Sequence, residues 1–267
     1  MKLTMLGTGN AMTSAVYNTC FVLEDEHGCF LVDGGGGNTL LDRLNEAQIN
    51  WMDIHDIFVT HKHIDHLLGI VWMLRLYLSA MSRGRFEGEV NIYSHAEVTG
   101  ILEMIARSVL GEKETAFIGD KLHFISVEDG EKRIITEHEV TFFDIHSTKA
   151  RQFGFAMMYD NGKKLTCCGD EPCHESCYEY VRDSEWLLHE AFCLYADKDK
   201  FNPYKISHST VKDGCELAEK LNVKNLVLYH TEDQTIAKRK ETYTAEGKQY
   251  FSGNLYVPDD LETIVLI

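Results

Sequence analysis

Residues 60–69, Thr-His-Lys-His-Ile-Asp-His-Leu-Leu-Gly, hold three imidazoles and one carboxylate within six consecutive positions. The apolar, β-branched run at 57–60 predicts a buried strand, and residues 67–81 predict a helix, so this stretch lies at a strand-to-helix turn. In an extended chain, residues two apart point the same way, while neighbouring side chains diverge. The spacing therefore directs one pair of side chains together and offsets the other, which suits two adjacent metal ions. The four candidate ligands are His61, His63, Asp65 and His66.

The composition describes an acidic globular protein. The chain has 267 residues, of which 44% are hydrophobic and 25% charged, enough for one large core or two small ones. Its 42 acidic and 26 basic residues leave a net charge of −16, which argues against broad electrostatic capture of nucleic acid. The sequence shows no signal peptide and no apolar stretch near the roughly 18 residues of a membrane span. We therefore expect a cytoplasmic protein with no membrane partner.

The eight cysteines do not form a paired CxxC framework. Four of them crowd together and allow a zinc site, but their irregular spacing favours ordinary reduced thiols. The 13 histidines are more informative, because a surplus of histidine is a compositional sign of metal chemistry. The crowded cysteines are Cys167, Cys168, Cys173 and Cys177.

Asp33 and the four glycines at 34–37 end an early predicted strand, where glycine lets the backbone approach another group closely. One interpretation is a phosphate cradle. The favoured one is a turn beneath the metal site, with Asp33 accepting a hydrogen bond from a ligating imidazole.

The predicted helix at 67–81 is apolar nearly all round, so it is buried internally or covered by a partner. A homodimer contact through this helix and a purely internal role both remain open.

Predicted strands repeatedly end in a candidate ligand, and active sites of α/β proteins collect at strand ends. No linker or low-complexity segment divides the chain, so we expect one domain, residues 1–267, with two halves that meet near residue 145. Asn161-Gly162 predicts a hairpin turn, and residues 254–257 with 263–266 predict a closing hairpin. The strand-end candidates are His61, His146, Asp170, Glu190 and His230.

Residues 60–69 resemble the HxHxDH signature of the metallo-β-lactamase superfamily, and the chain as a whole most resembles its ribonuclease Z branch. The opening Leu-Gly-Thr-Gly at 6–9, the Val-Asp-Gly-Gly at 32–35 and the Val-Pro-Asp-Asp-Leu-Glu at 257–262 are similar to motifs of that branch. The later motifs follow in order, at His146, Gly169-Asp170, His189-Glu190-Ala191, His208-Ser209-Thr210 and Tyr229-His230-Thr231.

This resemblance implies an α/β fold, a four-layer αββα sandwich with a two-metal site at one edge. Imidazole and carboxylate ligands suit two zinc ions best, although manganese or iron would tolerate them. By motif position, His61, His63 and His146 would hold the first metal, Asp65, His66 and His230 the second, and Asp170 would bridge them.

The implied chemistry is metal-dependent hydrolysis. Two such metals would acidify a bridging water to hydroxide and clamp a phosphodiester during in-line attack. His208 is the candidate to protonate or stabilise the leaving oxygen, and Glu190 would orient it. Asp65, His208 and Glu190 are therefore the expected catalytic residues.

The chain departs from the ribonuclease Z pattern in one respect. Enzymes of that branch carry a long transfer-RNA-binding arm between the positions of His146 and Asp170, but only 23 residues separate the two here. We therefore expect a phosphodiesterase that acts on a small or cyclic nucleotide or an RNA end, with folded nucleic acid doubtful. The alternatives are a lactone, thioester or sulfate ester hydrolase, a transfer RNA 3′-processing enzyme and a metal-binding scaffold without catalysis. Local positive charge for a small anion could come from Lys62, Lys149, Arg151 and Lys205.

Overall fold

The structure is a computed structural model that describes residues 1–160 and 162–266. The chain divides into two compact units, each formed by more than one segment. The first unit consists of Met1–Gly7, Tyr17–Val127 and Leu261–Ile267, and the second of Thr8–Val16 and Glu128–Asp260. The expectation of one domain with halves that meet near residue 145 stays a prediction. Asn161 of the expected hairpin turn lies outside the described residues.

The first unit is built on a mixed seven-stranded sheet in the order β14-β1-β2-β3-β4-β5-β6. The first three pairings in this order are antiparallel and the last three are parallel. The strands are β1 (Lys2–Gly7), β2 (Cys20–Asp25), β3 (Gly28–Val32), β4 (Ile54–Phe58), β5 (Val90–Ser94), β6 (Leu122–Ser126) and β14 (Thr263–Val265).

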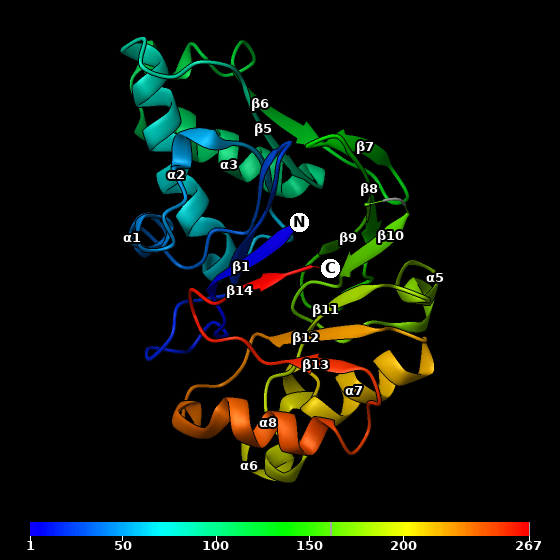
Figure 1. Cartoon of the computed structure of the whole chain (residues 1–267). Coiled ribbons are helices and arrows are strands. Elements are labelled where there is room, and N and C mark those ends of the chain that lie inside the picture. Colours follow the sequence, from blue (N-terminus) through cyan, green and yellow to red (C-terminus); the bar gives the residue numbers. More distant parts are fainter. Residues whose placement is uncertain (161, 267) are drawn as a thin grey trace. The chain divides into compact units, whose positions relative to one another are not determined.

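Helices α1, α2 and α3 pack against this sheet and form the core of the first unit with it (Figure 1). The long helix α2 is the core element that its composition predicts, and it begins three residues earlier than expected, at Ile64. The helices of this unit are α1 (Thr39–Glu46), η1 (Trp51–Asp53), α2 (Ile64–Ser82), α3 (Ala96–Val109) and α4 (Glu112–Thr115).

Helix α2 shows that one expectation was wrong, namely that no apolar stretch comes near the length of a membrane span. Among the described residues it is the one helix long and apolar enough, by length and composition, to cross a membrane. The window that meets this test is 56% buried within the structure. Met73, Leu74, Tyr77 and Leu78 are almost fully enclosed in the core, as in a buried helix of a globular protein.

The second unit repeats the same sheet pattern, in the order β13-β12-β11-β10-β9-β8-β7. Strands β7 to β10 pair antiparallel, and β10 to β13 pair parallel. The antiparallel pair β9–β10 occupies the short segment between His146 and Asp170, as its length predicts. The strands are β7 (Lys132–Ile135), β8 (His138–Asp144), β9 (Phe153–Tyr159), β10 (Lys163–Cys167), β11 (Trp186–Glu190), β12 (Asn225–Tyr229) and β13 (Asn254–Tyr256).

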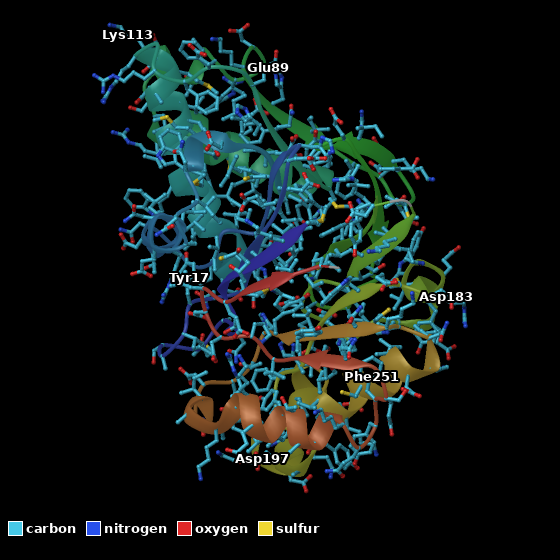
Figure 2. The ribbon with its side chains drawn as sticks, viewed as in Figure 1. Tyr17, Glu89, Lys113, Asp183, Asp197 and Phe251 are labelled. Carbon is cyan, nitrogen blue, oxygen red and sulfur yellow. The ribbon has the colours of Figure 1, made fainter. Side chains whose placement is uncertain are left out.

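Helices α7 and α8 cover β11, β12 and β13 of the second sheet. Phe251, which is labelled in Figure 2, precedes β13 and belongs to the core beneath these helices. The helices of this unit are η2 (Glu175–Cys177), α5 (Tyr178–Val181), η3 (Tyr195–Asp197), α6 (Lys198–Phe201), η4 (Pro203–Ile206), α7 (Val211–Lys220), η5 (Ile236–Lys238) and α8 (Arg239–Gly247).

The structure corrects the expected end of the chain. The last two strands do not form a hairpin, because β13 pairs parallel with β12 in the second sheet and β14 pairs antiparallel with β1 in the first. Alternation of apolar residues identifies a strand, but it does not select the partner, which here comes from more than 250 residues away for β14.

Candidate metal centre and catalytic pair

The first two candidate ligands lie between β4 and α2. His61 is buried, and His63 is the residue that precedes the first turn of α2. The His61 Nε2 and His63 Nδ1 atoms are 2.7 Å apart, as expected for side chains two positions apart in extended backbone. Two imidazole nitrogens are thereby directed at one point, where they could share an ion.

Asp33 orients the third imidazole of the motif, His66. Its carboxylate accepts hydrogen bonds from the Thr60 backbone N–H and hydroxyl, both at 2.8 Å, and lies 2.7 Å from His66 Nδ1. A carboxylate only accepts, so the His66 proton is on Nδ1, and the Nε2 lone pair lies beside Asp65, 3.2 Å from its Oδ2. Burial raises the pKa of Asp33, against the lowering effect of His66 and Thr60.

The glycine loop after Asp33 packs against the beginning of α2. Gly34 N–H donates to the His66 carbonyl and Gly69 N–H donates to the Gly35 carbonyl. A Cβ atom at Gly34 would lie 2.6 Å from the backbone nitrogen of Ile70, and one at Gly69 would lie 1.8 Å from the Gly34 oxygen. These glycines permit close helix packing, and the Gly34 amide is already used, which favours the turn over the phosphate cradle.

In the second unit, three candidate residues lie at the same edge of the sheet. Strands β10, β11 and β12 are parallel neighbours, and Asp170, Glu190 and His230 come at or just after their carboxyl ends. The His230 Nε2 lies 3.4 Å from Asp170 Oδ2. Gln152 Nε2 donates to the other carboxylate oxygen of Asp170 at 2.6 Å and fixes its orientation.

His146 stands apart from this group. It follows β8 with a positive φ of 58°, and its backbone N–H donates to the Asp144 carboxylate. The side chain of His146 is 57% exposed, whereas those of Asp170 and His230 are buried. Its predicted role as a ligand therefore stays a prediction.

His208 and Glu190 face one another in the second unit. His208 Nδ1 and Glu190 Oε2 are 3.6 Å apart, an ion-pair separation, and the other Glu190 oxygen accepts the Ser209 backbone N–H. The His208 ring stacks on Phe192, with ring centroids 5.1 Å apart, and lies 5.3 Å from the His230 ring. Burial alone would lower the pKa of His208, but the Glu190 carboxylate, aided by Asp170, raises it overall.

All eight cysteines are free, and in residues 1–160 and 162–266 no group with metal-binding geometry includes a cysteine. Helix α7 is capped by Thr210, whose hydroxyl accepts from the Asp213 N–H, and Asp213 completes the reciprocal capping box.

Sequence reasoning missed two residues that hold side chains of the candidate site in place. Thr60 precedes the first histidine of the motif and holds Asp33 through two hydrogen bonds. Gln152, the residue directly before β9, donates a hydrogen bond to Asp170, 18 residues further along the chain. Thr60 could have been found from its position in the motif, but no local pattern marks Gln152.

The residues present fit a metal ion. Each unit holds imidazole nitrogens and carboxylate oxygens close together in buried positions, and the outer ring nitrogen of His66 is fixed by Asp33. Such mixed nitrogen and oxygen donors, with their orientation set by further hydrogen bonds, are the usual chemistry of zinc sites.

Comparison with known proteins confirms the fold. The chain is 16% identical to YhfI of Bacillus subtilis, a metallo-β-lactamase fold protein, with a TM-score of 0.79 over 98% of both chains. It is 21% identical to the short form of human tRNase Z, with a TM-score of 0.75 over 100% of both chains. The protein therefore has the α/β metallo-β-lactamase fold, with two mixed sheets and their helices.

Sequence comparison confirms the resemblance to ribonuclease Z and identifies the family. A curated ribonuclease Z of Methanothermobacter thermautotrophicus is 27% identical over 305 aligned positions, which cover 99% of this chain and 96% of that protein. These relationships support a metal-dependent hydrolase. The chain belongs to the family described as anti-Pycsar protein Apyc1, which matches residues 1–251.

Proposed function

We propose that the protein is a two-zinc phosphodiesterase that acts on a small or cyclic nucleotide. The first zinc would be held by His61, His63 and His146, and the second by Asp65, His66 and His230, with Asp170 shared. When bound, such ions acidify water and neutralise charge on a phosphodiester. The resemblance to ribonuclease Z, whose name denotes cleavage of RNA, supports this bond type.

The observation that carries the proposal is the facing pair of His208 and Glu190 at the sheet edge that holds Asp170 and His230. Breaking a nucleotide phosphodiester releases an alkoxide, which needs a proton. Glu190 lies on the Nδ1 side of the His208 ring and raises its pKa, which favours the protonated form that a general acid needs. His208 Nε2 would then deliver the proton to the leaving oxygen, with Glu190 fixing the ring.

The distribution of positive charge supports a small substrate. Lys62 forms an ion pair with Glu97, and Arg151 forms ion pairs with Asp144 and Glu128. With a net charge of −16, these neutralised cations supply little field for a folded polyanion.

Lys149 is the cation best placed for a small anion. Its Nζ lies 3.7 Å from the buried Glu171 carboxylate, which also accepts from the Ser147 hydroxyl. The charge of Lys149 also acts on His208, since it lowers the pKa of that ring. We infer that Lys149 binds a phosphate oxygen of the substrate.

The test is a comparison of leaving groups in His208→Ala. Hydrolysis of cyclic and linear nucleotides, which have poor leaving groups, should fall by about 10²- to 10⁴-fold. Hydrolysis of bis-p-nitrophenyl phosphate should change much less, because p-nitrophenolate leaves without a proton. The surface variant His123→Asn is the matched control and should behave like the wild type on both substrates.

Three results would contradict the proposal. Equal losses on both substrate types would exclude His208 as the acid. Fewer than two metals per chain by elemental analysis, or unchanged turnover in Asp65→Ala, would exclude the two-metal site.

A second candidate function is transfer RNA 3′ processing, which the similarity to ribonuclease Z supports. The antiparallel strands β9 and β10 lie between His146 and Asp170, within a segment of 23 residues, where that branch carries its arm. Cleavage of precursor transfer RNA at ordinary salt would favour this candidate over the nucleotide. A panel that adds a lactone, a thioester and a sulfate ester covers the other hydrolases, and a protein inactive on all of them would be a metal-binding scaffold.

We also propose a cytoplasmic homodimer that packs through α2. Ile64, Leu68 and Trp72 lie four residues apart on one exposed stripe of this helix, with side chains 36–68% exposed. Beyond Trp72, an apolar cavity of about 190 Å³ extends to Val109 of α3. Light scattering should give twice the chain mass for the wild type and the single mass for Trp72→Lys, whereas a monomeric wild type would exclude this interface.

A further inference from the structure

Arg239, the first residue of α8, is a fully buried cation outside the predicted site. Its Nη1 donates to the hydroxyls of Thr8 and Thr231, each at 2.9 Å. Its Nη2 donates to the Pro258 carbonyl at 2.7 Å and to the Asp259 carboxylate at 3.1 Å. Both terminal nitrogens are thus committed, to acceptors from three segments that are far apart in sequence.

The backbone of Thr231 is held as firmly as its side chain. Its N–H donates to the Thr8 carbonyl at 3.0 Å, and its carbonyl accepts both the backbone and the side-chain N–H of Asn10. The Thr8 hydroxyl donates to Asp260 at 2.8 Å, so its lone pairs face Arg239. Thr231 therefore makes hydrogen bonds through its N–H, its carbonyl and its hydroxyl.

His230, directly before Thr231, has a positive φ of 59°. The left-handed region costs a residue with a Cβ on the order of 1–3 kcal/mol, and such a conformation persists only when its surroundings determine it. The hydrogen bonds to Thr231 determine the backbone on the carboxyl side of His230. In this conformation the His230 Nε2 lies 3.4 Å from Asp170 Oδ2.

We propose that Arg239 is a positioning residue, which holds His230 in its metal-binding orientation through the hydroxyl of Thr231. The proposal rests on the proposed function only in that His230 is taken as a zinc ligand. The hydrogen-bond partners of Arg239 given above are not themselves candidate ligands. Arg239 acts by joining the Thr8 loop, Thr231 and the segment at Pro258 into one support.

The geometry explains why arginine serves here. The planar guanidinium presents its terminal N–H groups in a fixed fork, which matches four acceptors at once. A lysine ammonium keeps the charge but has three donors on a single atom, so it cannot reach all four. Arg239→Lys should therefore resemble Arg239→Met more than the wild type.

The experiment measures zinc affinity by competition with a chromophoric chelator, together with the melting temperature of the metal-free protein. The variants are Thr231→Val, Arg239→Lys and Arg239→Met, and His230→Ala identifies the zinc ion that this ligand holds. Thr166→Val is the matched control, because it removes a buried hydroxyl of the same unit, bonded to Tyr180 and Ser184, away from His230.

We expect Thr231→Val and both Arg239 variants to lower the affinity for one zinc ion by about 10- to 100-fold. It should be the same zinc ion whose binding is lost in His230→Ala. Thr166→Val should lower the melting temperature without changing zinc affinity. If Thr231→Val and Arg239→Lys also lower the melting temperature and leave both zinc affinities unchanged, Arg239 is only structural and the proposal is wrong. A wild type that binds no zinc would instead contradict the proposed function, so failure of that function and failure of this proposal are distinguishable. If the Arg239 variants do not fold, Thr231→Val still decides the test.

Discussion

The substitution Asp33→Asn tests whether Asp33 orients the candidate ligand His66 through a hydrogen bond to its Nδ1 atom. The carboxylate accepts from His66 Nδ1 at 2.7 Å and from Thr60 at two further positions of 2.8 Å. An amide keeps the volume and one oxygen, which can still accept the Thr60 backbone N–H. Its NH₂ group then faces His66 Nδ1, which favours the tautomer with the proton on Nε2, where the metal would bind.

The expected change in zinc affinity follows from the loss of the hydrogen bond between His66 and Asp33. Such changes usually cost 10- to 100-fold in metal affinity, or about 1.4–2.7 kcal/mol. The unfolding free energy of the metal-free protein should change by less, because the substitution also removes a buried charge whose pKa burial has raised. The predicted signature of Asp33→Asn is therefore weaker zinc binding in a protein that remains folded.

The assay is chelator competition with parallel thermal unfolding of the metal-free protein. Asp56→Asn is the control, because it makes the same exchange on another partly buried carboxylate of the first unit, which accepts from Asn91 and Tyr93. Unchanged zinc affinity in Asp33→Asn, or an equal loss in Asp56→Asn, would refute the orienting role of Asp33.

Three further predictions follow from single contacts. Burial raises the pKa of Asp56, so its carboxylate destabilises the fold once the pH exceeds that pKa. Asp56→Asn should therefore raise the free energy of unfolding in urea by less than about 1 kcal/mol at pH 7 and leave it unchanged below about pH 4. A gain that does not depend on pH would contradict this cause. Thr210→Ala removes the hydroxyl that caps α7 and should cost about 1 kcal/mol in the same measurement, with Ser207→Ala neutral; equal effects would exclude Thr210 as the cap. Lys149→Met should raise KM for a small nucleotide about tenfold with little change in kcat, and an unchanged KM would exclude a phosphate contact at Lys149.

Local sequence patterns predicted much of the fold. Strands β9 and β12 are short, mostly apolar runs, Phe-Gly-Phe-Ala-Met-Met-Tyr and Asn-Leu-Val-Leu-Tyr, and such runs are typical of buried strands. The helix after the histidine motif was recognised by its apolar composition, although the side chain of His63 does not cap it and the start at Ile64 was missed. Strand β7 was not predicted, since it has only four residues and its two isoleucines are adjacent, which gives no alternation of polar and apolar positions.

Some of the contacts that orient residues of the candidate site could be predicted from the sequence, and others could not. The Asp33 turn could be anticipated, because an acidic residue followed by glycines lies close in sequence to a strand end. The contact of Gln152 with Asp170 and that of Arg239 with Thr231 could not, since the residues involved have no distinctive spacing. Burial of Arg239 in particular contradicts the surface position expected of an arginine.

The sequence by itself determined which residues are candidates for the site: the histidine-rich motif at 60–69, the strand ends that carry Asp170, Glu190 and His230, and the short segment before Asp170. These are properties of residue type and spacing, which act over a few positions. Only the tertiary structure decided that the last two strands join different sheets and that Arg239 supports the loop after His230. Such pairings depend on which distant surfaces bury one another, and a local pattern of apolar and polar residues is compatible with many of them.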